Sequence, residues 1–173
     1  MLYFYFVLII AKISKVYYII TMRVNIVCVG KIKEKFFTDA ILEYKKRLSR
    51  FCVFNIIEVD EETNQTNLEK KSEAEGELLL KKCSGVIVAL NGKGKMLSSP
   101  EIADFIKQKQ NAAQSEISFV IGGSNGLSKA VLQKANLVLS FGNITFPHQL
   151  FRVVLTEQIY RAFTILEGLP YHK

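Results

Sequence analysis

The stretch FVIGGSNGL, residues 119–127, runs from apolar, β-forming residues directly into a glycine-rich loop. Its apolar part belongs to the run from Ile117 to Ile121, which has the length and composition of a buried strand. Similar runs recur along the chain: Val24 to Val29, Val53 to Val59, Val86 to Leu90 and Leu137 to Ser140. Because amphipathic segments separate these runs, the sequence predicts an α/β fold with a mostly parallel sheet flanked by helices.

The segments between the predicted strands have apolar residues at helical spacing. We expect helices over Lys33 to Ser49, from the end of the polar loop 60–67 to about Lys82, from about Leu127 to Ala135, and over Gln149 to Glu167. A further helix should follow Ser99, with Ser99 as its N-cap and Pro100 at its first position. Asn91 to Lys95 predicts a turn, since its two glycines permit positive φ.

The last predicted helix has a polar side on which Arg152, Thr156 and Tyr160 recur every four residues. This side indicates either a solvated face or a surface for a dimer or RNA. Glu157 and Arg161 are spaced for an i,i+4 ion pair on the same helix.

The composition is that of one folded domain. The chain has 173 residues, 49% hydrophobic and 23% charged, which excludes a disordered or fibrous protein. A formal charge of +7 and a pI near 9.3 suggest an anionic partner such as nucleic acid. Cys28, Cys52 and Cys83 contain no C-x-x-C pair. We therefore expect buried thiols in a reducing cytoplasm, rather than disulfides or a thiolate metal site.

Residues 1–21 differ from the rest of the chain. This apolar stretch is interrupted by Lys12, Ser14 and Lys15, so it is too short to predict a membrane-spanning helix, and it lacks the charge order and cleavage site of a secretory signal. We interpret it as an extension upstream of the true start at Met22, with residues 22–173 as a single domain. A weak membrane anchor is the alternative, and mass spectrometry that finds Met1 at the native terminus would refute the late start.

Three predicted strand ends carry loops with few bulky residues, at 90–95, 122–126 and 142–148. Ligands of open α/β sheets bind outside the carboxyl ends of the strands, so we expect these loops to form one pocket. Their glycines would let backbone groups approach a planar ligand closely. The segment from Leu139 to Gln149 has no Asp, Glu, Lys or Arg, which suits a ligand with a cationic centre.

Other chemistries lack their motifs. The first strand is followed by Gly30-Lys31-Ile32-Lys33 rather than G-x-G-x-x-G, and Gly92-Lys93-Gly94-Lys95 does not have the spacing of a P-loop. Only His148 and His172 are present, without H-E-x-x-H, and no G-x-S-x-G elbow occurs. The sequence therefore disfavours dinucleotide or nucleotide-phosphate chemistry, a metal enzyme and a serine hydrolase.

Two C-terminal segments, FVIGGSNGL (119–127) and LSFGNITFPHQLFRVVLTEQIYRAFTILEGLPYHK (139–173), resemble the RlmH family of the SPOUT superfamily. VNIVCVGKIKEKFF (24–37) and IVALNGKGK (87–95) also resemble it, so the similarity spans Met22 to Lys173. The family methylates N3 of pseudouridine 1915 in helix 69 of 23S ribosomal RNA, within the assembled ribosome. The resemblance implies this activity in the cytoplasm, S-adenosylmethionine as cofactor, a C-terminal trefoil knot and a homodimer, with neither metal nor membrane involved.

Site residues follow from the resemblance position by position. The cofactor contacts that it implies are Leu90, Gly122, Gly123, Gly142, Asn143, Ile144, Thr145, Phe146 and Pro147. His172 is the first candidate for a general base and His148 the second, with Tyr171 and Arg152 as further catalytic candidates. Where the family's third strand usually ends in L-D, this chain has Leu90-Asn91.

A target inside the ribosome requires phosphate contacts, for which the candidates are Lys31, Lys33, Lys35, Lys93 and Lys95. Two other functions stay open at this stage: a noncatalytic RNA-binding module of the ribosome, and a nicotinamide oxidoreductase. Calorimetry with S-adenosylhomocysteine and with NAD distinguishes the three.

Overall fold

A computed structural model of the protein describes residues 22–173. Strands and helices alternate in the order β1 (Arg23–Val29), α2 (Lys35–Leu48), β2 (Val53–Val59), α3 (Leu68–Lys82), β3 (Val86–Met96), α4 (Ser99–Asn111), β4 (Glu116–Ile121), α5 (Lys129–Lys134), β5 (Leu137–Ser140) and α6 (His148–Leu166). The five strands form one sheet in the order β2-β1-β4-β3-β5, and all neighbouring strands are parallel. The predicted α/β class is confirmed. The extension predicted for residues 1–21 lies outside the described residues and stays a prediction.

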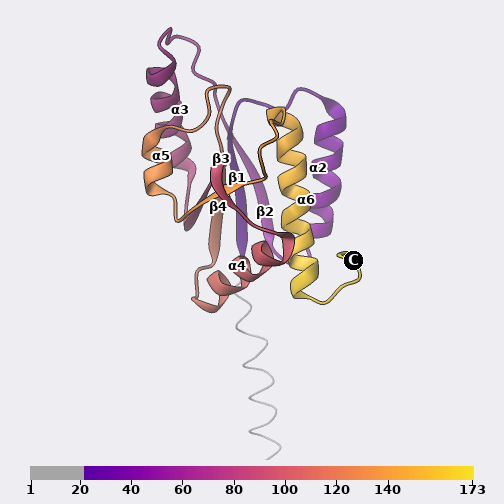
Figure 1. The fold of residues 1–173 in the computed structure, drawn as a ribbon. Coiled ribbons are helices and arrows are strands. Elements are labelled where there is room, and N and C mark those ends of the chain that lie inside the picture. The colour runs from indigo at the N-terminus through magenta and orange to yellow at the C-terminus, as the bar shows by residue number, and fades with distance from the viewer. Residues whose placement is uncertain (1–21) are drawn as a thin grey trace, which may run out of the picture.

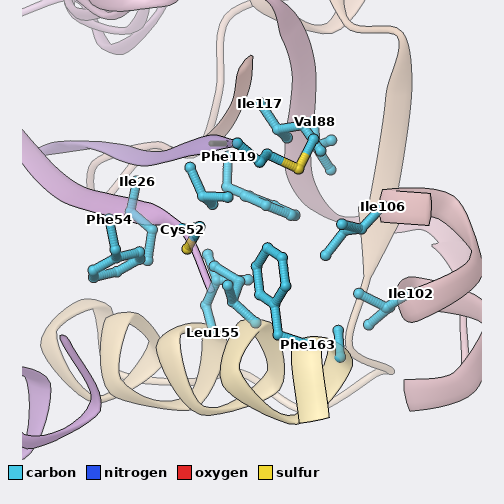
Figure 2. Close-up of a cluster of buried hydrophobic side chains, with 14 of the residues drawn as sticks. Ile26, Cys52, Phe54, Val88, Ile102, Ile106, Ile117, Phe119, Leu155 and Phe163 are labelled. Carbon is cyan, nitrogen blue, oxygen red and sulfur yellow. The ribbon is translucent and has the colours of Figure 1, made fainter. Parts of the chain in front are cut away.

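Helices cover both faces of the sheet. Helices α2, α4 and α6 pack on one face, and α3 and α5 pack on the other (Figure 1). The larger core lies under α4 and α6, where Phe163 and Leu155 of α6 and Ile106 of α4 point toward Phe119 of β4 (Figure 2). Burial of these side chains is the main favourable contribution to folding. No helix within residues 22–173 is long and apolar enough to cross a bilayer.

Strand β3 does not end in the turn predicted at Asn91 to Lys95. It continues to Met96, and Leu139 of β5 pairs first with Leu90 and again with Lys95. Between these pairings the chain arches over β5, so closely that a Cβ atom at Gly94 would lie 2.6 Å from the carbonyl oxygen of Val138. The prediction was wrong because neither Gly92 nor Gly94 has a positive φ. Gly94 is required for close approach, not for a turn.

Helix α4 is capped one residue earlier than predicted. Ser98, not Ser99, is the N-cap, and its backbone N–H donates to the Glu101 carboxylate at 2.8 Å, as part of a capping box. Pro100 therefore occupies the second helical position, and the Ser99 hydroxyl donates to Gln158 of α6 at 2.7 Å. Helix α5 begins at Lys129, two residues later than predicted, because Ser128 caps it.

Candidate functional site

The three loops that were predicted to converge form one cavity at the carboxyl ends of the strands. Its volume is about 300 Å³, at the lower end of the range for small-molecule sites. The lining residues come from all three loops and from the strand ends beside them: Leu90, Asn91, Gly92, Ile121, Gly122, Gly123, Ser124, Gly126, Leu127, Leu139, Phe141, Gly142, Ile144, Thr145, Phe146, His148 and Phe151.

The cavity contains no Asp, Glu, Lys or Arg among its lining residues, and His148 is its titratable side chain. Its walls are largely aliphatic and aromatic, and its polar groups are short side chains, such as Asn91 and Thr145, together with the backbone of the glycine loops. A flat, apolar ring with polar edges fits such a lining, because ring faces need apolar contact and ring edges need hydrogen bonds.

Most of the cofactor contacts implied by similarity line this cavity. Leu90, Gly122, Gly123, Gly142, Ile144, Thr145 and Phe146 do so, whereas Asn143 and Pro147 do not. Pro147 is instead the N-cap residue of α6. Sequence reasoning missed the apolar wall formed by Ile121, Leu139 and Phe151. Their apolar character indicated only that they belong to the core. Their position beside the strand-end loops was the feature that could have assigned them to the cavity.

The glycines at 122 and 123 are required by packing within the protein. A Cβ atom at Gly122 would lie 2.5 Å from the backbone of Gly126, and one at Gly123 would lie 2.8 Å from Oε2 of Glu75. Both glycines also line the cavity, so the expectation that they serve ligand approach stays a prediction beside this packing role. Gly142 is different: its φ is +100°, and a Cβ atom there would meet open space.

Glu75 of α3 lies behind the glycine loop and is only 1% exposed. Its Oε1 accepts from the backbone N–H of Glu62 at 3.2 Å and lies 4.0 Å from Nζ of Lys71. Its Oε2 has no hydrogen-bond partner among residues 22–173. Burial raises the pKa of this carboxyl, since the charged form loses its hydration.

Arg152 lies beneath the loop between β1 and α2 rather than in the cavity lining, and it is 1% exposed. Its Nη2 donates to the carbonyl oxygens of Val29 at 2.6 Å and Gly30 at 3.1 Å, and its Nη1 donates to Glu58 at 3.0 Å. Thr156 is also fully buried. A solvated polar face is thus wrong for these two residues; the ion pair between Glu157 and Arg161 is confirmed.

The first turn of α6 also holds the loop from Gly30 to Glu34, which carries two of the predicted RNA contacts. Oε1 of Gln149 accepts from the backbone N–H groups of Lys33 at 2.7 Å and Glu34 at 3.3 Å. Gln149 directly follows the cavity residue His148, so this lysine loop is tied to the rim of the cavity.

The lysines predicted to contact RNA are all exposed. Lys31 and Lys33 lie in the lysine loop, and Lys93 and Lys95 lie in the arch of β3. Lys35 begins α2 and forms an ion pair with Asp39 at 2.6 Å, so its charge is partly neutralised.

The C-terminal tail is fixed at the opposite end of α6 from the cavity. The hydroxyl of Tyr171 donates to Glu157 at 3.0 Å, and its ring packs edge-on against Tyr160. Burial, before any other cause, raises the pKa of Tyr171. Glu157 follows His148 by nine residues of α6, so the point where Tyr171 is bound lies about 13 Å along the helix axis from the cavity residue His148. Figure 1 shows the C-terminus at the end of α6 remote from the strand-end loops. A single chain therefore does not bring His172 to its own cavity.

The cysteine thiols and the possible metal ligands of residues 22–173 do not form a second reactive site. Cys28 and Cys52 are buried and Cys83 is half-buried, and burial raises the pKa of the Cys28 thiol to about 11, so it is protonated at neutral pH. No group of three His, Cys, Asp or Glu side chains within residues 22–173 is placed to hold a metal ion.

Comparison with known proteins gives a consistent assignment. A family model described as "Predicted SPOUT methyltransferase" matches residues 22–172. Ribosomal RNA large subunit methyltransferase H of Clostridium botulinum (strain Okra / Type B1) is 53% identical over 88% of this chain and 100% of its own length. The protein of that name from Carboxydothermus hydrogenoformans is 51% identical with the same coverage.

Among solved structures, a probable methylase family protein from Haemophilus influenzae Rd KW20 has a TM-score of 0.49 at 13% identity, covering 90% of this chain and 72% of its own. A likeness at this level adds nothing to the assignment, which stands on the family model and the sequence relatives. The chain therefore belongs to the SPOUT methyltransferases, in the family of the ribosomal RNA large subunit methyltransferase H proteins.

Proposed function

We propose that this protein transfers a methyl group from S-adenosylmethionine to N3 of pseudouridine 1915 in 23S ribosomal RNA, within the assembled ribosome and in the cytoplasm. The observation that supports this most strongly is the cavity, in which three strand-end loops meet without a charged side chain in the lining. The names of the relatives with over 50% identity support a ribosomal RNA substrate.

The residues of the cavity fit S-adenosylmethionine. Leu90, Ile121 and Phe141 offer an apolar surface for the adenine ring. The backbone at Gly123, at Gly142 and from Ile144 to Phe146 offers hydrogen-bonding edges. When bound, the cofactor supplies a methyl group on a sulfonium centre. A lining without Lys or Arg avoids repulsion of that positive charge.

The chemistry requires that N3 lose its proton as it gains the methyl group. The nitrogen bonds to the methyl carbon, the carbon–sulfur bond breaks, and the N3 proton passes to a base, for which His172 and His148 are the candidates. If N3 attacks as the deprotonated imide, opposite charges merge in the transition state. A cavity without charged side chains favours such a reaction.

The position of the tail leads us to infer a homodimer. His172 does not line the cavity of its own chain, and Tyr171 beside it is bound to Glu157, nine residues along α6 from His148. In a dimer, the tail of one chain would complete the cavity of its partner, with Tyr171 and its bond to Glu157 fixing the direction of His172. Arg152 would act as a positioning residue beneath the lysine loop rather than by contact with substrate.

The predicted C-terminal trefoil knot is part of the same proposal. The match of residues 22–172 to a SPOUT methyltransferase family model supports it. A knot of this kind would be one of the rare exceptions to unknotted topology.

A noncatalytic RNA-binding module of the ribosome is the second candidate, supported by the net charge of +7 and the exposed lysines. Mass mapping of ribosomal RNA from cells that lack the protein separates the two functions. Loss of one methyl group at pseudouridine 1915, restored by the wild-type gene, is the expected result. Intact methylation would contradict the proposed reaction. Calorimetry should show binding of S-adenosylhomocysteine and none of NAD.

A further inference from the structure

An aromatic side chain projects from the start of α2, beside the lysine loop. Phe36 is 62% exposed, and its ring centroid lies 4.3 Å from that of Phe37, which is half-buried. The surroundings of Phe36 indicate a partner for this ring.

The backbone before Phe36 is fixed by hydrogen bonds with side chains of α6 and β2. Oε1 of Gln149 accepts from Lys33 N–H and Glu34 N–H, the Glu58 carboxylate accepts from Ile32 N–H at 2.9 Å, and Arg152 binds the carbonyl of Gly30. These bonds fix the backbone that leads into α2. Phe36 therefore has a defined position relative to His148, which precedes Gln149 and lines the cavity.

The neighbours of Phe36 carry positive charge. Lys31 and Lys33 are exposed, and neither forms an ion pair within residues 22–173. Leu42, the other strongly exposed apolar residue of α2, is six positions along and so lies about 120° around the helix from Phe36. One isolated ring among lysines does not form the contiguous apolar patch that a protein interface needs.

We propose that Phe36 is a stacking platform for an unpaired RNA base next to the methylation target, with Lys31 and Lys33 binding the adjacent phosphates. Unstacked loop bases pack on aromatic side chains, and nearby lysines neutralise the backbone. The inference rests on the proposed RNA substrate and extends it: the enzyme binds a second nucleotide outside the cavity, on a loop fixed by α6.

The first test compares variants in binding to purified ribosomal large subunits over a range of salt concentrations. Phe36→Ala should weaken binding by roughly tenfold, within the range for loss of one stacked base. It should leave the slope of log affinity against log salt unchanged, because no charge is lost, whereas Lys33→Ala should lower that slope. Phe36→Tyr should retain near wild-type affinity. Leu42→Ala is the matched control, and S-adenosylhomocysteine affinity should stay constant throughout.

A spectroscopic test reports contact directly. The chain has no tryptophan, so Phe36→Trp introduces a unique probe, and Leu42→Trp is its control. Addition of protein-free 23S ribosomal RNA should quench the emission of Phe36→Trp and leave that of Leu42→Trp unchanged.

Four outcomes would overturn the inference. Wild-type affinity of Phe36→Ala for ribosomes, or unquenched emission from Phe36→Trp in a complex with RNA, would exclude stacking at this position while leaving the proposed reaction intact. A shift of Phe36→Ala to monomer in analytical ultracentrifugation would show that the ring belongs to an interface between copies of this chain. If the wild-type protein does not bind ribosomes, the proposed function fails, and this inference fails with it.

Discussion

The guanidinium group of Arg152 donates a 2.6 Å hydrogen bond to the main-chain oxygen of Val29, which lies 123 positions earlier in the chain. This bond joins the first turn of α6 to the carboxyl end of β1. Because Arg152 also pairs with Glu58, three elements meet at one buried cation. A buried charge without its partners is costly, so this junction should be among the most sensitive points of the molecule.

Arg152→Lys should lower the free energy of unfolding by about 2 kcal/mol. The one nitrogen of an ammonium does not reproduce the two separate nitrogens of the guanidinium, of which Nη1 bonds Glu58 and Nη2 bonds the two carbonyls. Urea unfolding followed by circular dichroism measures the loss. The control is Arg50→Lys, since Arg50 is exposed. Equal urea midpoints for the two variants would show that the junction does not depend on the guanidinium fork.

Gly123→Ala should reduce stability by about 1–2 kcal/mol and weaken S-adenosylhomocysteine binding, because the added methyl group meets Oε2 of Glu75 and displaces the glycine loop. In a Glu75→Ala background the same substitution should cost much less, and affinity should recover. A double-mutant cycle with calorimetry and thermal unfolding checks this coupling. Equal loss of affinity in both backgrounds would place the methyl group against the ligand instead.

Glu75→Gln should stabilise the protein at neutral pH. Burial raises the pKa of Glu75 in the folded state, so the contribution of the wild-type carboxyl is favourable only while it is protonated, below its unfolded pKa of about 4.5. That contribution is lost as the pH rises through the folded pKa. The gain in melting temperature from Glu75→Gln should therefore be larger at pH 7 than at pH 4. Glu73→Gln, on the exposed side of α3, is the control. An equal gain at both pH values would mean that folding does not raise the pKa of Glu75.

His172→Ala should slow single-turnover methyl transfer by about 100-fold, the lower end of the range for loss of a general base, with little change in cofactor affinity. Mixing this variant with Gly142→Val, which places a β-branched side chain at a φ of +100° in the cavity wall, should restore activity if the tail of one chain serves the cavity of another. Each variant alone is the control. No restoration after subunit exchange would contradict the shared site, and an unchanged rate for His172→Ala would remove it from the reaction.

Local sequence patterns were sufficient to predict the strands. Runs such as Ile117 to Ile121 consist mostly of β-forming apolar residues and end at a glycine. Strands of a parallel sheet are buried on both faces, so their sequences are apolar throughout rather than alternating. The convergence of the three loops followed from the parallel order itself, since parallel strands place their carboxyl ends at one edge.

Long-range contacts decided what the sequence could not show. Arg152 and Thr156 recur at a spacing typical of a solvated face, yet both are buried because acceptors at Val29 and Glu58 lie opposite Arg152. Gly123 fits a ligand loop by composition, but its missing Cβ accommodates Glu75, a residue 48 positions away. The separation of His172 from the cavity depends on the direction of α6, which no local pattern encodes.

The arch of β3 has a consequence for the entropy of ligand binding. Asn91 and Gly92 of this arch line the cavity. The arch is anchored at both ends by pairings with Leu139 and in the middle by the hydroxyl of Ser140, which donates to the carbonyl oxygen of Gly92 at 3.1 Å. A wall already fixed in this way loses little conformational freedom when a ligand arrives, so more of the contact energy is retained as affinity. The shape of the pocket on that side is thus a property of the folded sheet, set before any small molecule enters.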